Sequence, residues 1–125
     1  TTKLRCPRCK VQVDKTLGLK ACSCGGRLVS SVVNFGDALP AKELHDSFDH
    51  ASRCDLFIVV GSSLVVSPAN EMPRTAVRSG ARLVIINKGE TPLDVGCHLR
   101  FDEKIGQVLP SAVERLKTLM KKAKQ

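Results

Sequence analysis

Four of the six cysteines form two close pairs near the start of the chain. Cys6 and Cys9 enclose two residues, and twelve residues separate them from the second pair. In the second pair, Cys22 and Cys24 enclose a single residue. This spacing suits a tetrahedral structural Zn²⁺ site with four thiolate ligands and no open coordination position. The alternative is a pair of disulfide bonds, which is uncommon in intracellular proteins.

The composition predicts a small aliphatic core. Of the 125 residues, 42% are hydrophobic, but there is no Trp or Tyr and there are only four Phe. No apolar run approaches the ~20 residues that a membrane span needs, and the sequence TTKLRCPRCK is not a signal peptide. We therefore expect an intracellular protein, nuclear or cytoplasmic, without a membrane partner. Cys54 and Cys97 are expected to be small buried residues and not metal ligands.

The formal net charge of +8 is concentrated at two ends. Residues 1–30 contain seven Lys or Arg and one acid, and residues 117–125 contain four Lys and no acid. Basic ends of this kind can contact nucleic acid or acidic protein surfaces, or can simply be solvated. No aromatic residues that could stack on bases are interleaved with these charges. Their absence argues against nucleic-acid binding.

The remaining elements predict an α/β fold. A helix is expected from Pro40 to about Arg53, buried strands at 55–60 and 82–87, a short strand at 98–101, and a final helix with an apolar stripe from Ile105 to Met120. Ser67 and Pro68 have the residue types of a helix start, with Ser67 as N-cap, and Pro73 predicts a short turn before a helix that ends near Ser79. The predicted order of helices and strands is that of a doubly wound sheet, but with only three strands.

The stretch FIVVGSSLVVSPA, residues 57–69, joins a buried strand to a turn with glycine and hydroxyl groups. Such a turn can form a phosphate cradle, or it can be an ordinary corner of the chain. The sequence pattern by itself leaves both interpretations open.

Several segments together resemble the sirtuins, a family of NAD-dependent protein deacylases. The resemblance rests on the four-cysteine module and on the stretches VVNFGD at 32–37, GSSLVVSPA at 61–69 and LVIIN at 83–87. It implies that residues 1–30 form a zinc-ribbon module, and that residues 31–125 form the C-terminal half of a Rossmann-type NAD-binding domain.

The resemblance also implies site residues. The cofactor would lie against Gly61, Ser62 and Ser63, with a helix N-terminus beside them, and would be contacted by Asn87, Lys104 and Ile105. An acyl-lysine peptide would add as a strand between two segments, one formed by Val33, Asn34, Phe35 and Gly36 and the other by Leu64, Val65, Val66 and Ser67. Phe35 would line the acyl-lysine channel, and the Val33 carbonyl would accept a hydrogen bond from the side-chain amide.

In this family the acyl oxygen attacks the ribose as nicotinamide leaves, and a histidine acts as general base. That histidine and the first phosphate loop precede the four-cysteine module, whereas residue 1 here lies just ahead of it. His45, His50 and His98 match no catalytic position. We therefore expect no catalytic residue in these 125 positions, no deacylase activity from them alone, and dependence on the missing N-terminal half of the fold. Asp37 and Ser62 are milder departures, because Glu and Thr are usual there.

Two other functions stay open at this point. The chain can be a non-catalytic zinc-ribbon module that binds nucleic acid or chromatin through its basic ends. It can also be a degenerate protein that binds acyl-lysine peptides without turning them over.

Overall fold

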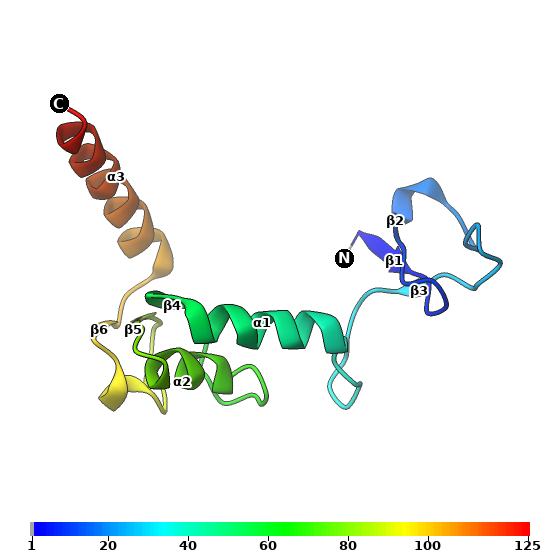
Figure 1. Ribbon diagram of the computed structural model, residues 1–125, viewed down its shortest axis with the longest axis horizontal. Coiled ribbons are helices and arrows are strands. Elements are labelled where there is room, and N and C mark those ends of the chain that lie inside the picture. Colours follow the sequence, from blue (N-terminus) through cyan, green and yellow to red (C-terminus); the bar gives the residue numbers. More distant parts are fainter. Residues whose placement is uncertain (1) are drawn as a thin grey trace. The chain divides into compact units, whose positions relative to one another are not determined.

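In the computed structural model, which describes residues 2–125, the chain divides into two units, Thr1–Pro40 and Ala41–Gln125. The first unit contains three short antiparallel strands in the order β2-β1-β3 (Figure 1). Their bounds are β1 (Lys3–Arg5), β2 (Gln12–Asp14) and β3 (Val29–Ser30). Leu4 pairs with Val13 on one side and with Ser30 on the other. Buried Cys6, Cys22 and Leu28 form the core of this unit.

A one-turn 3-10 helix, η1 (Lys15–Leu17), follows β2 and is capped by an acidic side chain. Asp14 Oδ1 accepts from Thr16 N at 2.9 Å and from Thr16 Oγ1 at 2.8 Å. These hydrogen bonds to the charged form lower the pKa of Asp14, the backbone bond contributing most. The only acid of residues 1–30 is therefore used locally, as a cap.

The second unit contains a parallel sheet in the order β4-β5-β6. Its strands are β4 (Leu56–Val60), β5 (Arg82–Ile86) and β6 (Leu99–Phe101). The helices are α1 (Ala41–Arg53), α2 (Glu71–Arg78), the short 3-10 helix η2 (Asp94–Gly96) and α3 (Ile105–Ala123) (Figure 1). The predicted helices at 40–53 and 105–120 and the three predicted strands are confirmed.

Two clusters of buried side chains hold this unit together. Val59, Leu83 and Ile85 pack with the loop residues Leu64 and Leu93 on one face of the sheet. Ala51 of α1, Ala76 of α2 and Ala81 form the second cluster, where small side chains let α1 and α2 approach closely. Pro73 is tolerated inside α2 because it is the third residue, where the backbone N–H has no partner within a helix.

Two details of the sequence-based prediction are wrong. Ser67 is not the N-cap of a helix: residues 67–70 form the expected turn, but α2 begins at Glu71 after Asn70, which makes no side-chain capping bond. The second error concerns β4, which is not buried on both faces. Val59 is 6% exposed, whereas Leu56 and Ile58 on the opposite face are 52% and 45% exposed. None of the helices described within residues 2–125 is both long enough and apolar enough to cross a membrane.

Candidate metal centre and candidate cofactor site

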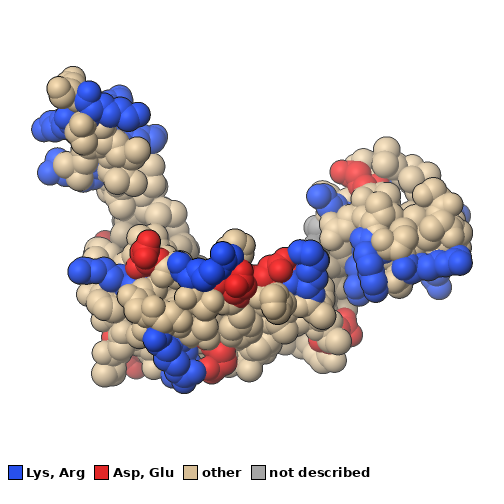
Figure 2. Space-filling view, in the orientation of Figure 1, with Lys and Arg blue, Asp and Glu red and all other residues tan. Residues whose placement is uncertain are grey.

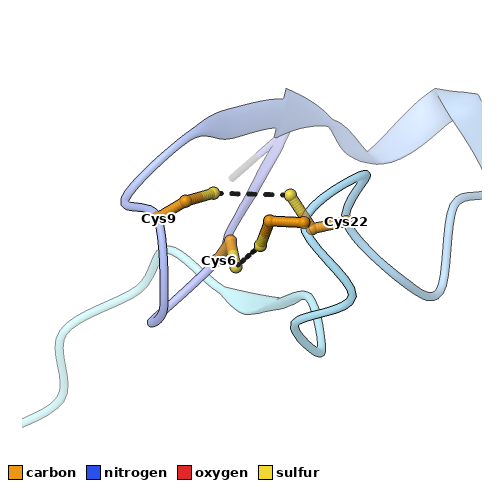
Figure 3. A group of neighbouring side chains, drawn as sticks. Cys6, Cys9 and Cys22 are labelled. Carbon is orange, nitrogen blue, oxygen red and sulfur yellow. Dashed lines mark hydrogen bonds between the residues drawn. The ribbon is translucent and has the colours of Figure 1, made fainter.

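The four cysteine sulfurs of the first unit converge on one point. Their Sγ atoms all lie within 4.8 Å of one another. Cys6 Sγ is 3.5 Å from Cys24 Sγ, and Cys9 Sγ is 3.5 Å from Cys22 Sγ (Figure 3). All six cysteines are free thiols in the part of the chain that the structure describes, so the structure favours the metal-site interpretation over the disulfide one.

Each pair lies on a tight backbone turn. In the first, Lys10 N donates to Cys6 O at 2.9 Å, and Cys6 N donates to Val11 O at 2.9 Å. In the second, Gly25 N donates to Cys22 O at 2.8 Å. Such turns aim backbone N–H groups at the sulfurs, and N–H donors stabilise the thiolate form. The turns therefore favour the thiolate form of the cysteines, which is the form that binds a metal ion.

The pKa values of the thiols reflect this arrangement. The backbone N–H of Cys9, assisted by that of Arg8, lowers the pKa of Cys6 to about 6. The pKa of Cys22 is also lowered, chiefly by the backbone N–H of Cys24. At Cys24 the Gly26 N–H lowers the pKa, but the neighbouring thiols Cys9 and Cys6 outweigh it and raise the pKa to about 12. Thiolates this close repel one another, so all four can ionise together only around a cation.

The donor set and its spacing fit Zn²⁺. Tetrahedral Zn–S bonds of about 2.3 Å place the sulfurs about 3.8 Å apart, which agrees with the observed separations. Gly26 allows the chain to pass close to this cluster, because a Cβ there would lie 2.6 Å from Cys6 Sγ. Cys54 and Cys97 take no part in the cluster and donate to the carbonyls of Ala51 and Asp94.

The second candidate site lies at the carboxyl end of the parallel sheet. Gly61 follows β4, Asn87 follows β5, and Lys104 and Ile105 follow β6. Gly61 N donates to Ile86 O at 2.9 Å, and Asn87 N donates to Phe101 O at 3.1 Å. These bonds continue the strand pairing and bring the three loops to one edge.

Gly61 cannot be exchanged freely. Its φ is 63°, and a Cβ at this position would lie 2.7 Å from Ile105 Cδ1. The structure therefore brings together two predicted cofactor residues from the ends of two different strands. Ser62 Oγ accepts from Leu64 N at 3.2 Å, while Ser63 is exposed. The helix N-terminus beside Gly61 is that of α3, which begins at Ile105, whereas α2 begins only at Glu71.

An arginine that the sequence-based prediction missed shapes the loop after β5. Arg100 Nη1 donates to Asn87 O at 2.7 Å and to Phe101 O at 2.6 Å, and Nη2 donates to Gly89 O. Its Nε donates to Asp94 Oδ1 at 2.8 Å. A charged residue between Leu99 and Phe101 in a short strand was the one available signal.

The two predicted peptide-binding segments lie in different units. Val33 precedes a turn in which Asp37 N donates to Asn34 O at 3.1 Å and Asp37 Oδ2 accepts from Asn34 N at 3.0 Å. Phe35 and Gly36 are the central residues of this turn, and Phe35 is 93% exposed. In the second unit Leu64 is buried, Val65 and Val66 are 66% and 48% exposed, and Ser67 is exposed.

The structure places the three histidines on α1 and against β5. His98 Nδ1 accepts from Leu83 N at 3.0 Å, which fixes this side chain against β5. His45 is exposed on α1, 3.7 Å from Asp46, and His50 is exposed on the same helix.

Comparison with known proteins identifies the family of this chain. A model described as the Sir2 family matches residues 1–68, which is more than half of the chain. The chain belongs to the Sir2 family. The sequence-based resemblance to sirtuins is thereby confirmed.

Two curated relatives of this Sir2-family chain illustrate the similarity. "NAD-dependent protein deacetylase 1" of Geobacillus kaustophilus is 45% identical over 113 residues, covering 90% of this chain and 47% of the relative. "NAD-dependent protein deacylase 2" of Archaeoglobus fulgidus is 43% identical over 97 residues, covering 77% and 38%. The Sir2-family chain thus spans about half the length of the curated relatives it matches.

Solved structures give the same result. The structure described as "Sir2-p53 peptide-NAD+" superimposes with a TM-score of 0.73 at 34% identity, over 94% of this chain and 52% of that one. "Structure of Sir2Tm bound to a propionylated peptide" does so with a TM-score of 0.72 at 35% identity, over 91% and 52%. The predicted fold class, a Rossmann-type parallel sheet in part plus a four-cysteine zinc-ribbon module, is confirmed.

Proposed function

We propose that this chain forms part of an NAD-dependent protein deacylase. The observation that carries the proposal is the meeting of Gly61, Asn87 and Ile105 at the carboxyl end of one parallel sheet. In doubly wound sheets this edge is where ligands bind. Similarity to relatives named as NAD-dependent deacetylases, and to a structure described as holding NAD and a peptide, supports the same assignment.

Asn87 is suited to a ribose hydroxyl by its own hydrogen bonds. Its Nδ2 donates to the carbonyls of Lys88 and Gly89, at 3.2 Å each. That orientation leaves Oδ1 to accept a hydrogen bond from a ligand hydroxyl. The exposed Ser63 hydroxyl would bind the phosphates, whereas the Ser62 hydroxyl is turned toward Leu64 N. Lys104 and Ile105 would lie beside the adenine.

We propose that each unit holds a segment to which an acyl-lysine peptide adds as a strand. In the first unit this segment is Val33, Asn34, Phe35 and Gly36, and in the second unit it is Leu64, Val65, Val66 and Ser67. Main-chain hydrogen bonds would supply most of the affinity, which accounts for a broad choice of target sequences. Phe35, at the tip of its turn, would contact the acyl group.

We assign residues 1–30 to the zinc module and residues 31–125 to part of the NAD-binding domain. When bound, NAD supplies an electrophilic ribose carbon and a nicotinamide leaving group, and this chain's residues bind and orient the reactants. Because His98 is committed to β5 and His45 and His50 are exposed on α1, none would act as the base. We therefore expect no deacylase turnover by these 125 residues in isolation.

Amide NMR of the isolated chain tests the binding role. NAD should shift the amides of residues 61–63 and Asn87, and an acetyl-lysine peptide should shift those of residues 33–36 and 65–67. Ser63→Ala should weaken NAD binding about fivefold, while Ser79→Ala, another exposed serine, should not. An absence of NAD-dependent shifts at millimolar concentration would refute the proposal. Equal response to acetylated and unmodified peptide would refute the acyl-lysine site.

A second candidate function, binding of nucleic acid or chromatin, is favoured by the basic surface of the first unit (Figure 2). Six of the seven Lys and Arg side chains of residues 1–30 are exposed: Lys3, Arg8, Lys10, Lys15, Lys20 and Arg27. A gel shift with duplex DNA tests it, since phosphate contacts make affinity fall steeply with salt. Charge-reversing Lys10→Glu and Lys20→Glu together should abolish a real complex, and Lys42→Glu with Lys88→Glu, outside both basic ends, is the matched control.

A further inference from the structure

A cavity of about 220 Å³ opens beside α2 in the second unit. Its inner surface is apolar, because Leu83 and Leu93 are 1% and 9% exposed and Pro73 and Val77 complete the wall. Leu83 lies near the start of β5, whereas Asn87 follows the end of that strand. The cavity is therefore at the opposite end of β5 from the candidate cofactor site, and it shares no lining residue with it.

Two arginines line this cavity from one face of α2. Arg74 and Arg78 are four residues apart, so their side chains project in the same direction. Arg74 Nε is buried without a hydrogen bond, and its nearest acid is Glu71 Oε1 at 3.5 Å. Within residues 2–125, the Arg78 guanidinium has no hydrogen bond or ion pair. The cavity thus combines an apolar interior with two cationic groups that have donors to spare.

Negative charge close to the cavity is already compensated. Asp94 adjoins the wall residue Leu93, but its carboxylate accepts from Thr91 N, Thr91 Oγ1 and Arg100 Nε. Among residues 2–125, Glu71 is the one acid that pairs with Arg74, and its 3.5 Å contact is too long for a strong hydrogen bond. An incoming anion would therefore meet two arginines and one weak competitor.

We propose that this cavity binds a small organic acid whose carboxylate pairs with Arg74 and Arg78 and whose apolar body packs on Leu83 and Leu93. A planar guanidinium matches a carboxylate in two parallel hydrogen bonds, and the apolar interior favours a hydrocarbon body. The size limits the ligand, because cavities for drug-sized molecules measure roughly 300–1,000 Å³. A single ring or a short chain fits. This binding is independent of the proposed deacylase role.

Phenylacetate is a suitable probe, with phenylacetamide as its uncharged equivalent. In amide NMR titrations of the full 125-residue chain, phenylacetate should bind saturably at about millimolar concentration. The shifts should centre on Val77, Leu83 and Leu93. Phenylacetamide should bind at least about fivefold more weakly. Addition of NAD should leave phenylacetate affinity unchanged. The organic-acid site and the proposed NAD site can therefore be tested, and can fail, separately.

Substitutions distinguish specific binding in this cavity from nonspecific attraction of an anion to a basic chain. Arg74→Gln and Arg78→Gln should each weaken binding about fivefold, while Glu71→Gln should strengthen it about twofold by freeing Arg74. Arg53→Gln removes the same charge from α1 and should change nothing. The proposal is overturned if shifts do not saturate, if phenylacetamide binds as well, or if Arg53→Gln weakens binding as much as the α2 variants.

Discussion

Arg100 and Asp94 form an ion pair across the loop that follows β5, with Arg100 Nε 2.8 Å from Asp94 Oδ1. Both side chains are largely shielded, at 20% and 28% exposure. The same guanidinium binds the carbonyls of Asn87 and Gly89. This one side chain therefore joins η2, β6 and the segment that carries Asn87.

Replacing Arg100 should loosen that loop. We expect Arg100→Met to lower the free energy of unfolding by about 2–3 kcal/mol, because several carbonyls and a carboxylate lose a charged donor. Urea denaturation measures this. Arg82→Met, at an exposed position of β5, is the control and should change the midpoint little. An unchanged midpoint for Arg100→Met would contradict the structural role.

Asp94 should make the second unit sensitive to acid. The Thr91 hydroxyl, then the Thr91 backbone N–H and Arg100, lower the pKa of Asp94 below its usual range. A carboxyl whose pKa is lower in the folded state stabilises the fold above its unfolded pKa, and this contribution is lost as pH falls through the folded pKa. Stability should therefore decline below about pH 4. Asp94→Asn should flatten this decline in denaturation curves measured across acid pH.

The cysteine cluster should bind one Zn²⁺ per chain. Metal analysis after purification should find it, and Cys→Ser at position 6, 9, 22 or 24 should abolish tight binding. Cys54→Ser and Cys97→Ser are matched controls that should retain the metal. Chelation should unfold the first unit and leave the second intact, because four-thiolate sites contribute folding energy directly. Amide NMR signals, which report on each unit separately, measure this difference. Retention of the metal by a Cys22→Ser chain would argue against the site.

Gly61→Ala should cost about 1–3 kcal/mol through its positive φ and its approach to Ile105. Gly80→Ala separates these causes, since Gly80 has φ 96° but open space around its Cβ position. We expect Gly61→Ala to be the more damaging in thermal denaturation, with part of the difference recovered by Ile105→Ala. Equal losses for the two glycine variants would show that the Ile105 contact has no effect.

The exposed face of the sheet should promote self-association. Leu56 and Ile58 on β4 and Leu99 on β6 are each about half exposed, at 52%, 45% and 56%. Sedimentation should show assembly that increases with protein concentration, because apolar faces and open strand edges favour pairing. Ile58→Thr should weaken it about tenfold, whereas Val95→Thr at an already exposed position should not. If the chain is monomeric at every concentration, the exposed apolar face of the sheet does not drive self-association.

The local features of this chain were predictable from its sequence, and those set by distant contacts were not. The cysteine spacing and the apolar stripe of α3 are signals within one segment. Arg100 escaped notice because its partners, Asn87 and Asp94, lie on a loop that only the folded sheet brings within reach. The structure was needed to place Ile58 on the exposed side, because a continuous apolar strand does not reveal which face of its sheet is left uncovered.

The turn that carries Phe35 is where we expect a protease to cleave this chain first. Between Ser31 and Pro40 the chain forms no helix or strand, and Phe35 stands in it at 93% exposure while Phe48, Phe57 and Phe101 are partly buried. A protease that cleaves after aromatic residues would cut here first. The products would be a fragment with the cysteine cluster and a fragment with the parallel sheet, so a brief digestion prepares each unit for separate study.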